Sequence, residues 1–181
     1  ASPRPARAAR CAALNAGDRL RPGKPDEIGL EHGFGTRHTL PITPTDVVFA
    51  KQVHGATLVR AEPGAARVEA DALWTDRPGT AVGVVTADCV PILIAHESGR
   101  FVCAVHAGWR GLMAGVVERT ARAMRDLRDP PHSARLGPCI RVGCYEFDGP
   151  ELDDLAARYG AVVRGRSTWG TPALDLPAAV H

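Results

Sequence analysis

Three closely spaced apolar runs constrain this chain more than any other feature of its sequence. Residues 80–86 and 90–95 are almost entirely small or apolar, and residues 101–105 form a third run after a Glu-Ser-Gly-Arg connection. Apolarity this continuous is typical of strands that are buried on both faces of a sheet. We therefore expect residues 80–86 to form such a strand, with residues 90–95 and 101–105 as the next two.

Reactive side chains stand at the ends of these predicted strands. Cys89 lies between the first two runs, and His106 follows the third. A second histidine, His54, follows an apolar and β-branched run at residues 47–53, and Gly55 after it permits a turn. Three residues that can bind a metal or transfer protons thus occupy strand exits.

A long helix is predicted after His106, over residues 110–128, because apolar residues recur there at the spacing of one buried stripe. A second helix is expected at residues 151–159, opened by Pro150 and ended by Gly160. Shorter extended segments are expected at residues 57–61, 70–75, 134–137 and 161–163.

The length of 181 residues fits one domain. Residues 1–27 are rich in Ala, Arg, Pro and Gly without a clear period, so we expect an irregular N-terminal segment. Residues 28–181 are expected to form a single catalytic domain. With 45% hydrophobic but only 5% aromatic residues, its core must consist mostly of Ala, Val and Leu.

Charge and cysteine content narrow the class of protein. A formal net charge of +2, with basic residues scattered along the chain, gives no reason to expect a nucleic acid or membrane partner. The five cysteines are odd in number, and neither a secretory signal nor an apolar run of about 20 residues is visible. We expect a monomeric cytoplasmic protein with reduced thiols.

The residues His54, Cys89 and His106 have the chemistry of a zinc site. A catalytic zinc ion commonly has three protein ligands, drawn from thiolates, imidazoles and carboxylates, and one open position. Small residues beside each of the three would let backbone and substrate approach the metal closely. No Cys-x-x-Cys pair is present, and a free cysteine such as Cys89 can also be a small residue of the core.

The same residues permit a reaction without a metal. Cys89 as a thiolate nucleophile and His106 as its base would form a dyad for acyl transfer or deamidation, with Asp88 or Asp71 orienting the imidazole. His54 has no role in that arrangement.

Three further residues are candidates for binding substrate or phosphate. Arg37 and Arg110 each follow a small or turn-forming residue, and Arg110 precedes a predicted helix whose start could receive an anion. Cys139, in the Gly-Pro-Cys-Ile turn, would line the site. Taken singly, each arginine can equally be a solvated surface residue.

Six short blocks carry a family resemblance. KQVHG, ADALWT, TADCVPIL, VHAGWRG, GPCI and CYEF occur in this order between about Gly33 and Phe147. They resemble the signature blocks of the laccase-domain family, also called multicopper polyphenol oxidases and, more recently, zinc-dependent purine nucleoside phosphorylases.

The resemblance implies an α+β fold, an α/β/β/α sandwich of mixed sheets related to bacterial toxin deamidases with a Cys-His dyad. It implies zinc on His54, Cys89 and His106. It also implies cleavage of adenosine, inosine, guanosine and methylthioadenosine by phosphate, and deamination of adenosine. Older descriptions of the family imply a copper-dependent phenol oxidase, and some bacterial members are linked to peptidoglycan precursor editing.

For these reactions Arg37 or Arg110 would hold phosphate, and Asp88 or Asp71 would supply acid/base catalysis. In one respect the chain departs from the family. Members usually carry a C-terminal block with a Cys-Thr pair and an Arg-rich strand, and we expect this block to be absent here, because the sequence stops at His181.

Overall fold

The computed structural model describes residue 34 and residues 47–96, 99–126 and 131–180. The segment predicted to be irregular, residues 1–27, and the candidate anion ligand Arg37 lie outside this part of the chain. The described residues form an α+β fold with mixed sheets, as the family resemblance implies.

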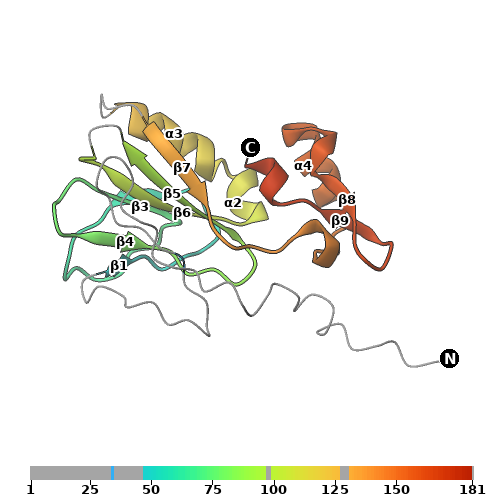
Figure 1. The fold of residues 1–181 in the computed structure, drawn as a ribbon, viewed down its shortest axis with the longest axis horizontal. Helices are drawn as coiled ribbons and strands as arrows, with labels where there is room; N and C mark the ends of the chain where they lie inside the picture. The colour runs from blue at the N-terminus through green and yellow to red at the C-terminus, as the bar shows by residue number, and fades with distance from the viewer. Residues whose placement is uncertain (1–33, 35–46, 97–98, 127–130, 181) are drawn as a thin grey trace.

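A five-stranded sheet with strand order β2-β3-β6-β5-β7 forms the centre of the molecule (Figure 1). Its strands are β2 (Leu58–Arg60), β3 (Ala72–Thr75), β5 (Val90–His96), β6 (Val102–Ala107) and β7 (Pro131–Leu136). β2 and β3 run parallel, and the other neighbouring pairs are antiparallel. The apolar runs at residues 90–95 and 101–105 correspond to β5 and β6, which are inner strands, as predicted.

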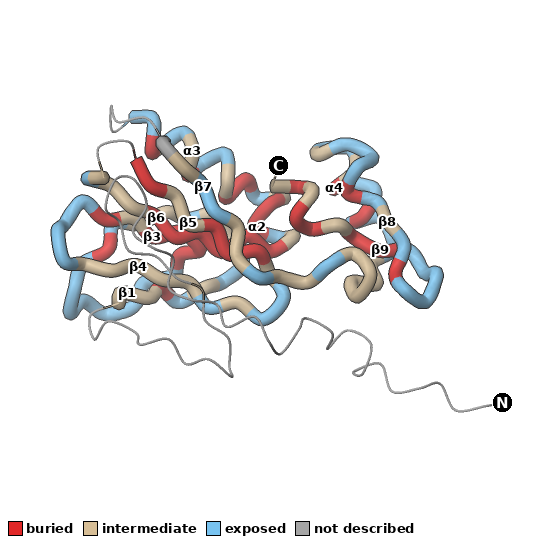
Figure 2. The backbone as a smooth tube through the Cα atoms, viewed as in Figure 1, coloured by how far each residue is buried: buried red, intermediate tan, exposed pale blue. Residues whose placement is uncertain are grey.

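The two faces of the sheet are covered by different elements. Two helices, α2 (Trp109–Met113) and α3 (Val116–Asp126), lie over one face, and a parallel pair of strands, β1 (Val47–Phe49) and β4 (Ala81–Gly83), lies on the other side (Figure 1). Ala72 of β3 belongs to the core beneath the helices, whereas Leu73 packs with Ala50 and Ala70 towards β1 and β4. Figure 2 shows that the most deeply buried backbone runs through the middle of the sheet and into α2.

The helix predicted over residues 110–128 is two helices. Gly115 has a φ of 84° and separates α2 from α3. Leu112, Val116 and Met124 are nevertheless fully buried, so the apolar stripe continues across the break. A periodicity of apolar residues therefore cannot reveal this break.

The expectation that residues 80–86 form a strand buried on both faces is wrong. Only Ala81–Gly83 are in a strand, all three are half-buried, and the Val85 side chain is 68% exposed. Small residues serve here for close packing, since a Cβ on Gly83 would lie 2.7 Å from Cε1 of Phe49 in the neighbouring strand.

The C-terminal part packs beside these layers. Helix α4 (Pro150–Tyr159) begins after Gly149 and is followed by Gly160, close to the prediction. Residues 161–163, predicted as a strand, form the 3-10 helix η2 (Ala161–Val163), because Gly160 begins a turn that the Val163 amide closes. The remaining elements are the antiparallel pair β8 (Arg164–Arg166) and β9 (Pro172–Leu174) and the 3-10 helices η1 (Val142–Cys144) and η3 (Pro177–Ala179).

Leu152 and Leu155 of α4 join the same buried cluster as Val90 and Leu112, so α4 and the central sheet share one core. In Figure 1, α4 lies beside the layers with β8 and β9, and none of the described helices covers β1 and β4. None of the described helices is long and apolar enough to cross a membrane.

Candidate metal centre

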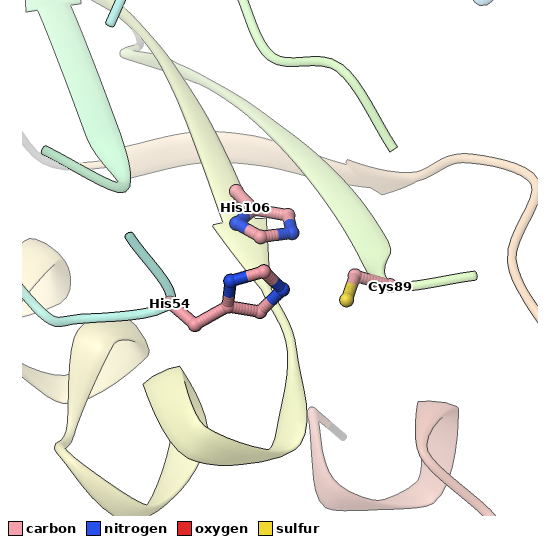
Figure 3. Close-up of side chains that lie close together, drawn as sticks. All are labelled: His54, Cys89 and His106. Atoms are coloured by element: carbon pink, nitrogen blue, oxygen red, sulfur yellow. The ribbon is translucent and has the colours of Figure 1, made fainter. Parts of the chain in front are cut away.

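His54, Cys89 and His106 converge at one end of the central sheet (Figure 3). Their ligand atoms, one from each side chain, all lie within 4.8 Å of one another. The antiparallel pairing of β5 with β6 brings two of them together, because Val90 lies opposite Ala107 and Pro91 lies opposite His106. Cys89 therefore directly precedes one strand, close to where His106 lies near the end of its neighbour, and His54 reaches them from a turn outside the sheet.

The turn that carries His54 has an unusual backbone. Within the described part of the chain, His54 is the only non-glycine residue with a positive φ, at 59°. Such a conformation is uncommon outside glycine and is found preferentially at functional sites. It aims three successive amides at one carboxylate: Asp71 accepts hydrogen bonds from Val53 N at 3.2 Å, His54 N at 2.9 Å and Gly55 N at 2.7 Å.

Asp71 also holds the second histidine. Its Oδ1 atom lies 2.8 Å from Nδ1 of His106, and both side chains are almost completely buried. An ionised carboxylate only accepts hydrogen bonds, so Nδ1 of His106 is the donor, and in the neutral imidazole Nε2 then carries the lone pair that a metal needs. Carboxylates orient metal-binding histidines in this way.

The ionised form of Asp71 is the stable one. Burial raises the pKa of this carboxyl, but the hydrogen bonds from His106 and from the amides of residues 53–55 lower it by more. The net pKa lies below its ordinary value. Asp71 is thus a fixed negative charge beneath both histidines.

Cys89 is half-buried and carries a free thiol. Burial raises the pKa of this thiol, and the negative charges of Asp88 and Asp71 raise it further. A metal-free nucleophile needs the opposite environment, one that lowers the pKa. A bound cation removes the difficulty, because coordination deprotonates a thiol outright.

Gly108 lets the ligands approach. A Cβ at this position would lie 2.8 Å from Sγ of Cys89 and 3.1 Å from Cδ2 of His54. The sequence marks Gly108 only as a small neighbour of His106, whereas the structure shows that it packs directly against the other two side chains. One thiol and two imidazoles with this spacing fit the donor preferences of zinc.

Three further predicted site residues, Asp88, Cys139 and Arg110, lie in the described part of the chain. Asp88 is exposed, and its backbone carbonyl accepts a hydrogen bond of 2.9 Å from Ile140 N, which brings the loop of Cys139 beside Cys89. Cys139 is a half-buried free thiol, and burial raises its pKa. Arg110 is exposed in α2, with its guanidinium 4.5 Å from the centre of the Trp109 ring.

Sequence reasoning gave no role to Tyr145 and Phe147, which form an aromatic group with Trp109 beside the centre. The rings of Trp109 and Tyr145 each lie 5.5 Å from that of Phe147. Burial raises the pKa of Tyr145, the charges of Cys89 and Asp88 raise it further, and Arg110 lowers it. The phenol is therefore within electrostatic reach of both Cys89 and Arg110. In the sequence, this tyrosine follows a loop and belongs to no apolar period, so only the CYEF block marks it.

A family model described as multi-copper polyphenol oxidoreductase laccase matches residues 31–181. A purine nucleoside phosphorylase of Streptomyces coelicolor is 42% identical over 157 residues, which is 79% of this chain and 61% of that protein. A purine nucleoside phosphorylase of Streptomyces griseus is 38% identical over 87% of this chain and 65% of its own length.

Solved structures agree with this relationship. A Neisseria meningitidis protein of the DUF152 family superposes with a TM-score of 0.63 at 31% identity, covering 74% of this chain and 56% of its own. The Bacillus licheniformis protein YfiH gives a TM-score of 0.65 at 26% identity, covering 75% of this chain and 57% of its own. The chain thus spans somewhat less than two thirds of the length of these relatives.

Proposed function

The chain belongs to the multi-copper polyphenol oxidoreductase laccase family, and from this membership we propose that it carries the zinc site of a purine nucleoside phosphorylase. The observation that carries the proposal is the convergence of His54, Cys89 and His106, whose ligand atoms lie within 4.8 Å of one another. The names of the two Streptomyces relatives support the reaction.

The three ligands would act together with Asp71. His106 would bind the metal through Nε2, because Asp71 occupies Nδ1, and the same carboxylate holds the backbone of His54. When bound, zinc would supply a Lewis acid with an open position beside the substrate. Asp71 would keep the donor atoms in place during the reaction rather than transfer protons, since it is buried and already accepts four hydrogen bonds.

Phosphorolysis replaces the bond between ribose C1′ and the purine nitrogen by a bond between C1′ and a phosphate oxygen. The phosphate must be held close to C1′ while positive charge develops on the sugar, and the departing purine must gain a proton. We assign the phosphate to the exposed guanidinium of Arg110, with Arg37 as a second candidate from the sequence alone. Asp88, exposed and adjacent to Cys89, is the candidate for proton transfer, and Cys139 would line the same space.

Adenosine, inosine, guanosine and methylthioadenosine are the proposed nucleosides, and deamination of adenosine is a proposed second activity. Both rest on the family resemblance. A monomeric protein of the cytoplasm is the state in which we expect this chemistry.

A copper-dependent phenol oxidase is the second candidate, and the description of the matching family favours it. Two imidazoles and one thiolate are donors that copper also accepts. A metal-free Cys-His hydrolase is disfavoured by the position of His54, which that mechanism does not use.

Metal analysis combined with product analysis tests the proposal. Protein purified without added metal is expected to contain stoichiometric zinc and to convert adenosine plus phosphate into adenine and ribose 1-phosphate. Chelation should abolish turnover and added zinc should restore it, while inosine among the products would report deamination. His54→Ala, Cys89→Ala and His106→Ala should each lose both zinc and turnover.

Other outcomes would favour a different function for the same site. Stoichiometric copper with oxidation of phenols would favour the oxidase, and turnover that survives chelation would favour the hydrolase. A variant that keeps full zinc content would remove its residue from the ligand set.

A further inference from the structure

Gln52 joins the chain segments of two proposed ligands. Its carboxamide makes two hydrogen bonds to the backbone of Val85: Nε2 donates to the Val85 carbonyl at 2.7 Å, and Val85 N donates to Oε1 at 2.8 Å. Gln52 comes two residues before His54, and Val85 comes four residues before Cys89. The contact therefore links the segments that lead to these two side chains.

The contact continues a strand ladder. β1 and β4 pair in parallel from Val47 opposite Ala81 to Phe49 opposite Gly83. Beyond that point the backbone of residue 51 turns away to pair with the segment 68–70, and its amide donates to Val68 O. The Gln52 carboxamide then takes the place of a backbone peptide group of β1 as the partner of Val85. Like a peptide group, it has one donor and one acceptor in one plane.

Besides Gln52, the Ile140 amide holds the segment before Cys89, through its hydrogen bond of 2.9 Å to Asp88 O. Residues 84–89 belong to no helix or strand, and the Val85 side chain is 68% exposed, so it gains little from packing. His54, in contrast, is tied through Asp71 to His106. The contact between Gln52 and Val85 joins the segment of His54 to the segment of Cys89, so it can influence the position of the thiol relative to the histidines.

We propose that Gln52 is a positioning residue of the metal centre, whose two hydrogen bonds to Val85 set the separation between the His54 and Cys89 segments. This inference rests on the proposed function, because it assigns Gln52 to the same site. Gln52 does not touch the ligand atoms and acts through the backbone that carries them. Residues that hydrogen-bond to metal ligands typically change metal affinity by about 10-fold to 100-fold when they are replaced, and for Gln52, which acts one step further away, we expect the lower end of this range.

Gln52→Met and Lys51→Met test the proposal as a matched pair. Methionine has the length of glutamine without its donor and acceptor, and Lys51 lies on the same segment but pairs with Glu69, away from Val85. Zinc affinity is measured by competition with a chromophoric chelator, and cobalt is used as a spectroscopic probe of the Cys89 thiolate. Hydrogen exchange of the metal-free proteins reports protection of the Val85 amide.

The Gln52→Met variant is expected to bind zinc about 10-fold more weakly than the wild type, with a weaker thiolate-to-cobalt absorption band and an unprotected Val85 amide. Lys51→Met should resemble the wild type in all three measurements. Gln52→Glu, which keeps the acceptor but loses the donor, should fall below the wild type in affinity as well.

Unchanged zinc affinity and an unchanged cobalt spectrum in Gln52→Met would overturn the inference, as would an equal loss in Lys51→Met. Should Gln52→Met fail to fold, Gln52→Glu decides by the same criteria. A wild-type protein that binds no zinc would overturn the proposed function instead. In that case, hydrogen exchange at residues 85–89 of the metal-free variants still decides whether Gln52 holds the Cys89 segment.

Discussion

At the scale of single residues, Asp71 connects the two histidines, and a substitution of this residue is therefore the most direct test of the site. Replacing Asp71 by Asn turns an amide nitrogen towards donors that need an acceptor. We expect Asp71→Asn to weaken zinc binding by about 10-fold to 100-fold. We also expect it to destabilise the metal-free protein by about 1–3 kcal/mol, the cost of an unsatisfied buried polar group.

Competition for zinc and urea unfolding measure these two effects. Asp153→Asn is the control, because Asp153 is exposed and pairs only across the surface with Arg164. Zinc affinity of Asp71→Asn equal to that of the control would show that Asp71 does not orient the ligands.

Gly108 supports a second prediction at this scale. In Gly108→Ala the new methyl group would stand 2.8 Å from Sγ of Cys89 and 3.1 Å from Cδ2 of His54, so the ligands must shift. Zinc affinity should fall by at least about 10-fold, while Gly143→Ala, whose methyl group would meet only the Thr168 side chain at 3.2 Å, should bind zinc normally. Isothermal titration with zinc distinguishes the two, and similar affinities would mean that Gly108 is not required for the approach of Cys89.

Residue types and strand ends suggested His54, Cys89 and His106 as a group, and the family resemblance assigned them as metal ligands. The choice between Asp71 and Asp88 stayed open in the sequence, because it depends on the pairing of β3 with β6, which places Asp71 opposite His106. Gln52 was not foreseen at all. Its partner is a backbone group 33 residues away, and a backbone group has no signature in the sequence.

At the scale of elements, side chains of α4 form hydrogen bonds to the residues on both sides of the break between α2 and α3. Arg158 donates hydrogen bonds to Met113 O at 2.8 Å and to Glu118 Oε1 at 2.9 Å, and the Tyr159 hydroxyl lies 2.7 Å from Leu112 O. Gly115, at the break itself, has a positive φ that other residues rarely adopt. The helix that follows His106 is thereby held from outside the sheet.

Glu118 makes these contacts sensitive to pH. Burial raises the pKa of its carboxyl, but hydrogen bonds from Arg158, its own amide and Tyr159 lower it by more, so the folded-state pKa lies below the ordinary value of 4.5. A carboxylate with a depressed pKa contributes stability above its unfolded pKa and loses it as the pH falls through the folded pKa.

We expect Glu118→Gln to be less stable than the wild type by up to about 1 kcal/mol at neutral pH, since the pair is partly exposed. The difference should persist down to about pH 5 and shrink below about pH 4.5. Urea unfolding across this range measures it, and high salt should reduce it at neutral pH. A difference that stays constant down to pH 3 would contradict the assignment.

Periodicity predicted the type of most elements but not their interruptions. A buried stripe from Leu112 to Met124 looks the same whether or not a turn at Gly115 divides it. Small apolar residues likewise predicted burial for residues 80–86, although Gly83 is small because Phe49 packs against it, and the strand is at the outside of the fold. Local patterns do not encode such contacts between elements.

At the scale of the whole molecule, one core joins the sheet to the C-terminal part. Leu155 of α4 is fully buried and shares its cluster with residues of β5, β6 and α2. Leu155→Ala should destabilise the protein by about 2–5 kcal/mol and leave a single unfolding transition. Val162→Ala, at a 65% exposed side chain nearby, should change stability by less than about 0.5 kcal/mol.

Urea unfolding followed by both circular dichroism and tryptophan fluorescence tests this. Two separate transitions in Leu155→Ala would mean that α4 and the sheet fold as independent units. The sequence predicted a single domain from length alone, and it held no information on which surfaces of α4 and the sheet meet.

The shared carboxylate of Asp71 has one more consequence. Because it binds the backbone at His54 and the ring of His106, one carboxylate ties together the segments that carry the two histidines, and the thiol of Cys89 stands on a separate segment. A shift of residues 84–89 would therefore move the sulfur relative to both histidine segments at once.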